Sequence, residues 1–239
     1  MEKIDFKDLI VYEDDDYVLV NKPPHFATLD ERTADNLRSV LRLAKAYVAD
    51  AQVCHRLDKE TSGVLAIAKN PAAYRHLSMQ FEHRQVVKSY HAVVSGIHDL
   101  DSISVYLPIA QLTNGTVKID REKGKEAETI FNTRRAYRLH TLVDCHPITG
   151  RMHQIRIHLS CLKASIVMDE QYGGKPIYLS QLKKNFNLKR NTEEMPLIQR
   201  VALHAYALTF ARPDGEEITV EAPYPKDFAA LIRQLEKNA

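Results

Sequence analysis

Short apolar runs separated by turn residues cover most of the chain, and they predict a protein rich in β-strands. In the run 88–94, strand alternation places Tyr90, Ala92 and Val94 on one face. Asn114-Gly115 is a typical hairpin turn inside a predicted β-meander. The predicted strands are residues 17–20, 64–68, 88–94, 102–107, 116–119, 128–138, 139–145, 201–210 and 217–221.

Helical periodicity is found in segments that lie between these runs. Asp35 can cap a helix over 36–48, and Asn70-Pro71 offers a cap and a first-turn proline for a second helix. A third helix is expected to open at Thr149-Gly150-Arg151, and an amphipathic helix closes the chain. Strands with interspersed helices favour an α+β fold, with a mixed, mainly antiparallel sheet and flanking helices.

The composition is that of an ordinary globular protein. With 239 residues, of which 44% are hydrophobic, the chain can bury a core, and we expect a single domain over 1–239 with a polar, basic insertion near 175–200. A net charge of +2 is too small to indicate nucleic-acid binding, so any basic surface must be local. The chain has no apolar run of 18 residues and no apolar segment near its start, so we expect a soluble, cytoplasmic protein.

Cysteines and histidines do not form a recognisable metal site in the sequence. The odd cysteine count and apolar neighbours favour reduced thiols at Cys54, Cys145 and Cys161. Pairs such as Cys54-His55 or His153 with His158 lack a metal-ligand spacing, so structural roles are expected. No phosphate-binding or dinucleotide motif is present, and we expect no cofactor.

The stretch HRLDKETSG at 55–63 places several charges between a predicted helix and an apolar strand. Charges in such a position are costly to bury unless they are paired. One interpretation is a solvated turn in which Gly63 allows a tight bend. The other is a functional loop in which Asp58 acts as a covalent nucleophile. That carboxylate would have to stay ionised, and Arg156, on a predicted helix close to His153, is a candidate partner or simply a surface residue.

This stretch resembles the signature loop of the RluA-type RNA pseudouridine synthases, and TGRMHQIRIHL at 149–159 resembles their second long motif. Other matches follow in family order over most of the chain. They are Asn21-Lys22-Pro23, K-x-Y-x-A at 88–92, D-x-x-YG at 169–173, and the block from Leu203-His204-Ala205 to Pro225.

The resemblance implies an isomerase that converts specific uridines of tRNA or ribosomal RNA to pseudouridine on a flipped base, with no cofactor and no metal. Asp58 would be the nucleophile and would attack either the sugar or the base. Arg156 would form an ion pair with Asp58, and the Tyr90 ring would lie against the target base. The implied partner is structured RNA, and we expect a monomer with no membrane association. The basic residues expected to contact RNA are Arg56, Lys88, Arg151, His153, Lys183, Lys184, Lys189 and Arg190.

Some positions depart from the family pattern. Met168 stands where the family often has glycine, Pro24-His25 replaces a pair ending in glycine, and Met152 replaces threonine, so local loop shape should differ. Because the first motif begins near residue 17, we do not expect the N-terminal RNA-binding domain that is frequent in the family. Two other functions stay open: a non-catalytic RNA-binding module on the same fold, and a carboxylate hydrolase or nuclease, which would need a second carboxylate or a metal cluster.

Overall fold

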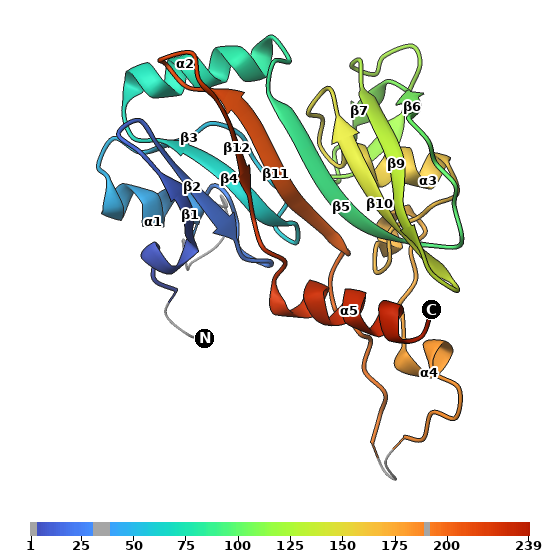
Figure 1. Cartoon of the computed structure of the whole chain (residues 1–239). Coiled ribbons are helices and arrows are strands. Elements are labelled where there is room, and N and C mark those ends of the chain that lie inside the picture. The colour runs from blue at the N-terminus through green and yellow to red at the C-terminus, as the bar shows by residue number, and fades with distance from the viewer. Residues whose placement is uncertain (1–3, 31–38, 189–191) are drawn as a thin grey trace. The chain divides into compact units, whose positions relative to one another are not determined.

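In the computed structural model, residues 4–30, 39–188 and 192–239 are described, and the chain groups into two units (Figure 1). Unit 1 comprises Met1–Ser89 and His204–Pro223, and unit 2 comprises Tyr90–Leu203 and Tyr224–Ala239. Each unit contains strands and helices. The prediction that 1–239 forms one domain stays a prediction.

Unit 1 is built from β1 (Ile10–Glu13), β2 (Tyr17–Lys22), β3 (Gln52–Val53), β4 (Ser62–Ala68), β11 (Leu203–Ala211), β12 (Glu217–Glu221), the short helix η1 (Lys7–Leu9), α1 (Val40–Tyr47) and α2 (Pro71–Glu82). β2 is antiparallel to β1 and β4, whereas β4 is parallel to β11, with His204 opposite Ser62. β12 returns antiparallel along β11, and β3 pairs with β4. All seven residues of β4 are buried, so this strand forms the centre of the unit.

Unit 2 is built from β5 (Val87–Ser95), β6 (Ile103–Tyr106), β7 (Ile109–Gln111), β8 (Val117–Ile119), β9 (Glu128–Ala136), β10 (His140–Pro147), α3 (Gln154–Cys161), η2 (Glu170–Tyr172), α4 (Leu179–Leu182) and α5 (Lys226–Lys237). β5, β10, β9 and β6 follow one another as antiparallel neighbours, and β7 and β8 form a separate hairpin. Figure 1 shows α3 beside β9 and β10. The two units together confirm the predicted α+β class with mixed, mainly antiparallel strand pairing.

The core of unit 2 joins α3 and α5 to the strands. Ala92, Val93 and Val94 belong to it and Tyr90 packs against it, so residues from both faces of β5 are buried here. Phe228, Leu231 and Leu235 bury the apolar face of α5 in the same core. A smaller cluster contains Ile157 of α3 and anchors the β7–β8 hairpin to the helix.

Helix boundaries follow the capping residues. α2 begins where predicted, because the Asn70 side chain accepts a hydrogen bond of 2.8 Å from the Ala73 N–H and Pro71 follows the cap. α1 begins at Val40, later than predicted, because Ser39 caps it. The Asp35 expected to cap it lies outside the described residues.

The third predicted helix also begins later than expected. The expectation that Thr149-Gly150-Arg151 opens the helix is wrong, because α3 starts at Gln154 after His153, whose φ of 53° is left-handed. The Gln154 side-chain oxygen accepts hydrogen bonds from the Thr149 hydroxyl and the Arg151 N–H, which holds this segment as a turn. The sequence pattern also failed to predict β1, β3 and β7, which are short.

The polar insertion near 175–200 contains α4. Arg138 at the β9–β10 turn donates from Nη2 to the carbonyl oxygens of Gln181 and Leu182, which attaches α4 to the strands of unit 2. In the described parts of the chain, no helix is both long and apolar enough to cross a membrane.

Candidate active site

The loop that carries Asp58 lies between β3 and β4 in unit 1 and is held through its backbone. Leu57 is buried, and its N–H donates to Thr28 Oγ1 at 3.2 Å while the Thr28 hydroxyl donates to the Leu57 carbonyl oxygen at 3.0 Å. On the other side, the Thr61 N–H donates to the Asp58 carbonyl oxygen at 3.1 Å. Asp58 is half-buried, and its peptide groups are fixed before and after the side chain.

Lys22 anchors the same loop from the end of β2. Its side chain is fully buried, and Nζ donates to the carbonyl oxygens of Pro23, Phe26 and Lys59 at 3.1, 2.8 and 3.1 Å. A buried ammonium is costly unless it is well hydrogen-bonded, so these bonds fix both the turn after β2 and the residue that follows Asp58. The sequence motif Asn21-Lys22-Pro23 identified Lys22 without indicating this contact.

The end of the loop is joined to β11. Ser62 Oγ lies 2.9 Å from Nδ1 of the buried His204, whose Nε2 lies 2.9 Å from the Ala222 carbonyl oxygen. Because Nε2 must donate to that carbonyl, Nδ1 of the neutral ring accepts from the Ser62 hydroxyl. Gly63 has a φ of 117°, and a Cβ there would overlap the Ala205 carbonyl oxygen. This close approach explains the glycine that ends HRLDKETSG.

His55 and His158, which belong to the pairs considered as metal ligands, both have hydrogen bonds within the fold. His55 Nε2 accepts from the Ala66 N–H at 3.1 Å, and burial together with the charge of Lys88 lowers the pKa of His55 to about 3. Burial lowers the pKa of His158, which lies between Thr129 Oγ1 and the Leu107 carbonyl oxygen. The three cysteines are free thiols, which confirms the prediction. Residues 4–30, 39–188 and 192–239 contain no group of three His, Cys, Asp or Glu side chains arranged to hold a metal ion.

Arg156 lies in α3 of unit 2 and is held through its side chain. Its Nε and Nη2 donate to the two carboxylate oxygens of Asp169, both at 2.7 Å, and Nη2 also donates to Gln171 Oε1 at 3.0 Å. The guanidinium carbon lies 5.0 Å from the centre of the Tyr172 ring. Arg156 and Asp169 are both buried, so this is a two-bond ion pair in a dry site. The expected pairing of Arg156 with Asp58 stays a prediction.

Tyr90 lies on β5, opposite Cys145 of β10, and is half-buried. Lys88 lies two residues earlier on the same strand, and burial together with the charge of Arg84 lowers the pKa of Lys88 to about 8. Alternation places the side chains of Lys88 and Tyr90 on one face of β5.

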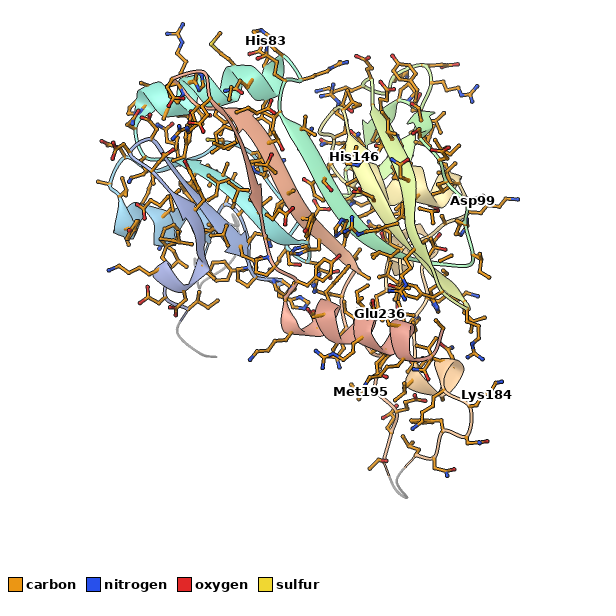
Figure 2. All side chains as sticks on the ribbon, viewed as in Figure 1. His83, Asp99, His146, Lys184, Met195 and Glu236 are labelled. Atoms are coloured by element: carbon orange, nitrogen blue, oxygen red, sulfur yellow. The ribbon has the colours of Figure 1, made fainter. Side chains whose placement is uncertain are left out.

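The residues predicted to contact RNA have different environments. Arg56 is exposed, whereas Arg151 is half-buried and donates from Nε to the Glu126 carbonyl oxygen at 2.9 Å. His153 precedes α3, and its Nδ1 lies 2.9 Å from the Tyr172 hydroxyl oxygen. Lys183 and Lys184 are exposed, and Figure 2 shows Lys184 directed outward from the insertion. The two other predicted residues, Lys189 and Arg190, lie outside the described residues.

Sequence reasoning missed the roles of several residues around the Asp58 loop and around Arg156. Asp169 was part of a matched motif, but nothing in the sequence indicated that it pairs with Arg156. His25 and Met168, which stand where the family pattern has glycine, both adopt left-handed backbone, with φ of 60° and 67°. At both positions, a residue with a side chain therefore occupies backbone that glycine favours.

A family model described as RNA pseudouridylate synthase matches residues 16–161. The ribosomal large subunit pseudouridine synthase C of Buchnera aphidicola is 35% identical over 240 residues, covering 96% of this chain and 71% of that protein. The protein of the same name from Escherichia coli is 34% identical, covering 97% of this chain and 71% of that protein.

Among solved structures, the human RNA pseudouridylate synthase domain containing 4 superposes with a TM-score of 0.70 at 25% sequence identity. The match covers 97% of this chain and 95% of that one. The two motifs, the fold and these comparisons agree. The chain belongs to the RNA pseudouridylate synthase family, and it is an isomerase that acts on RNA.

Proposed function

We propose that Asp58 is the nucleophile of this isomerase, that Arg156 keeps it charged and oriented, and that Tyr90 holds the detached uracil. The observation that carries the proposal is the anchoring of the loop at Asp58, whose neighbours are bonded to Thr28 and Lys22. A nucleophile reacts efficiently only when it is held in a productive geometry, and a small displacement is costly. A loop tethered on both sides of one carboxylate meets this requirement.

The reaction moves the uracil on its sugar. The bond between N1 and C1′ breaks, the base turns, C5 forms a new bond to C1′, and the proton leaves C5 while N1 gains one. Atoms and electrons balance without an oxidant or a metal ion. The target base is stacked in RNA, so it must be flipped out before Asp58 can reach it, and Tyr90 offers a ring for the extruded uracil.

The substrate that we propose is large-subunit ribosomal RNA, with tRNA as the alternative. The relatives from Buchnera aphidicola and Escherichia coli support this, because both are named for the large ribosomal subunit. We propose further that the enzyme acts in the cytoplasm as a monomer on structured RNA, without a metal ion.

The RNA would be held by basic residues from two parts of the chain. Arg56 lies in the loop that carries Asp58, Lys88 lies on β5, and Arg151 and His153 precede α3. The insertion would add phosphate contacts that fix the RNA without reading its sequence. Its contributing residues are Lys183, Lys184, Lys189 and Arg190.

The test of the nucleophile is Asp58→Asn. This variant keeps the shape of the side chain, so we expect it to fold. Its affinity for RNA should stay within about threefold of that of wild type, because phosphate contacts supply most of the affinity. It should form no pseudouridine. Release of tritium from C5-tritiated uridine in RNA measures the reaction. Turnover near that of wild type, in a preparation free of the native enzyme, would disprove the assignment.

The test of the substrate is a map of pseudouridines in total RNA from cells with and without the gene. We expect one or a few positions in large-subunit ribosomal RNA to lose the modification, and to regain it with wild type but not with Asp58→Asn. Loss confined to tRNA would replace the proposed substrate by the alternative.

A further inference from the structure

The guanidinium of Arg156 is held by one short turn, 169–172, in two different ways. The Asp169 carboxylate accepts one hydrogen bond from Nε and one from Nη2 of Arg156. These two bonds fix the direction of the guanidinium within its plane. The ring of Tyr172 lies 5.0 Å from the guanidinium carbon and covers one face of the plane. A fork alone allows the plane to tilt, and a ring against its face restricts that tilt.

The Tyr172 ring is itself fixed at both ends. Its hydroxyl oxygen accepts from the Val117 N–H at 3.1 Å and lies 2.9 Å from His153 Nδ1. One hydrogen bond joins the Tyr172 hydroxyl to His153 Nδ1, and the tautomer of His153 sets its direction. At the backbone, the Ser165 hydroxyl donates to the Tyr172 carbonyl oxygen at 2.8 Å. The Tyr172 hydroxyl therefore connects β8 and His153, the residue before α3, to the turn that holds Arg156.

We propose that Tyr172 is a positioning residue for Arg156, with its ring setting the plane of the guanidinium and its hydroxyl setting the place of the ring. The inference rests on the role proposed above for Arg156 in catalysis. Tyr172 does not touch the reacting atoms in this proposal. Its effect is on the rate of the chemical step and passes entirely through the orientation of Arg156.

Two variants separate the ring from its hydroxyl. Tyr172→Phe keeps the ring and removes the bonds to Val117 and His153, and we expect the single-turnover rate to fall about threefold to tenfold. Tyr172→Leu removes the ring as well, and the rate should fall about thirtyfold or more. The dissociation constant for the RNA should stay within about twofold in both, because neither variant removes a phosphate contact.

The rate is measured with C5-tritiated transcripts of the RNA found by the mapping experiment, with enzyme in excess. Tyr12→Phe is the matched control, since the Tyr12 hydroxyl donates to Asp14 at 2.8 Å on β1 and should not influence the rate. Rates that are unchanged in Tyr172→Phe and Tyr172→Leu would overturn the inference. A large rise in the dissociation constant for RNA, with the rate at saturation kept, would also overturn it.

The same substitutions are then made in Arg156→Lys, because an ammonium has no plane to orient. We expect Tyr172→Leu to change the rate by less than about twofold in that background, since the two positions act as one unit. Equal losses in both backgrounds would overturn the inference for Tyr172 and leave the role of Arg156 intact. Full activity of Arg156→Lys alone would disprove the role of Arg156 and the inference with it.

Discussion

The two units hold their proposed catalytic groups by opposite means. In unit 1, the loop with Asp58 is fixed through peptide groups, by Thr28, Lys22 and Thr61. In unit 2, Arg156 is fixed through its own side chain, by the carboxylate of Asp169. Backbone bonds are insensitive to the side chain at position 58, whereas the fork exists only for a guanidinium. Substitution at 58 leaves these backbone bonds in place, whereas substitution at 156 removes the two-bond fork.

The two units also differ in net charge, and the net charge of the whole chain does not show this difference. Unit 1 carries 14 Lys and Arg against 18 Asp and Glu, a net charge of −4, and unit 2 carries 19 against 13, a net charge of +6. The overall +2 gave no indication of nucleic-acid binding. Because phosphate attraction depends on local charge, RNA affinity should rest mainly on the basic residues of unit 2.

After the complete loss expected for Asp58→Asn, the largest effect is expected at Arg156. Arg156→Lys keeps the charge and loses the two-bond fork, so we expect turnover to fall about a hundredfold or more, as when a catalytic group is slightly displaced. Arg156→Ala leaves the buried Asp169 unpaired and should lower the free energy of unfolding by about 3–5 kcal/mol. Tritium release and urea denaturation measure the two effects. Full activity of Arg156→Lys would show that the reaction does not depend on how the Arg156 side chain is held.

The pH dependence of stability should reveal His55, which is half-buried and neutral in the folded chain. Its pKa of about 3 lies below the ordinary value of 6.5, so the unfolded chain binds a proton first as the pH falls. Stability is therefore present above pH 6.5 and is lost as the pH falls toward 3, by about 1.4 kcal/mol for each pH unit between these values.

The variant His55→Gln isolates this contribution. Glutamine has an oxygen that can accept from the Ala66 N–H but does not titrate, so its urea denaturation midpoint should fall less between pH 7 and pH 4.5 than that of wild type. Parallel losses in both proteins would mean that other groups control acid unfolding.

Lys22→Met tests the backbone anchoring in unit 1. The substitution keeps the apolar length and leaves three carbonyl oxygens without their shared donor, so we expect a loss of about 1–3 kcal/mol in the free energy of unfolding. The turnover should fall as well, because the Lys59 carbonyl next to Asp58 is released. Lys45→Met is the control, since Lys45 is exposed on α1 of the same unit. An unaltered Lys22→Met enzyme would show that Thr28 and Thr61 are sufficient.

Neutralising the insertion tests the difference in charge. With Lys183, Lys184, Lys189 and Arg190 changed to glutamine, we expect weaker RNA binding and a salt dependence that is flatter by roughly one unit of slope at most for each lost phosphate contact. The rate at saturating RNA should persist. Changing Lys7, Arg42, Lys45 and Lys69 of unit 1 gives a matched loss of charge. Equal effects of the two sets would mean that total charge, and no particular unit, governs affinity.

The smallest effect is expected at His25, which is exposed at a φ of 60°. His25→Gly should raise the free energy of unfolding by about 0.5–1 kcal/mol, because relief of left-handed backbone exceeds the entropy cost of glycine. His83→Gly is the control, since His83 is also exposed and has a φ of −84°. Thermal denaturation should show a gain for the first variant only.

Local signals predicted the parts of the fold that local forces determine. The Asn70-Pro71 cap placed the start of α2, and Glu217–Glu221 was predicted with the bounds that the structure has. The predictions failed where a competing local contact was not visible, as at Gln154, whose side chain holds the preceding residues in a turn. The shortest strands were missed because a run of two to four residues carries too little periodicity.

By itself, the sequence determined the fold class, the family and the two motifs with Asp58 and Arg156, because residue order and periodicity carry this information. Only the tertiary structure decided that Lys22 holds the Lys59 carbonyl, that His204 holds Ser62, and that Asp169 and Tyr172 hold Arg156. Ser62 and His204 are 142 positions apart. Such contacts depend on strand register and on which faces pack together, and no local propensity encodes a bond between residues that meet only after folding.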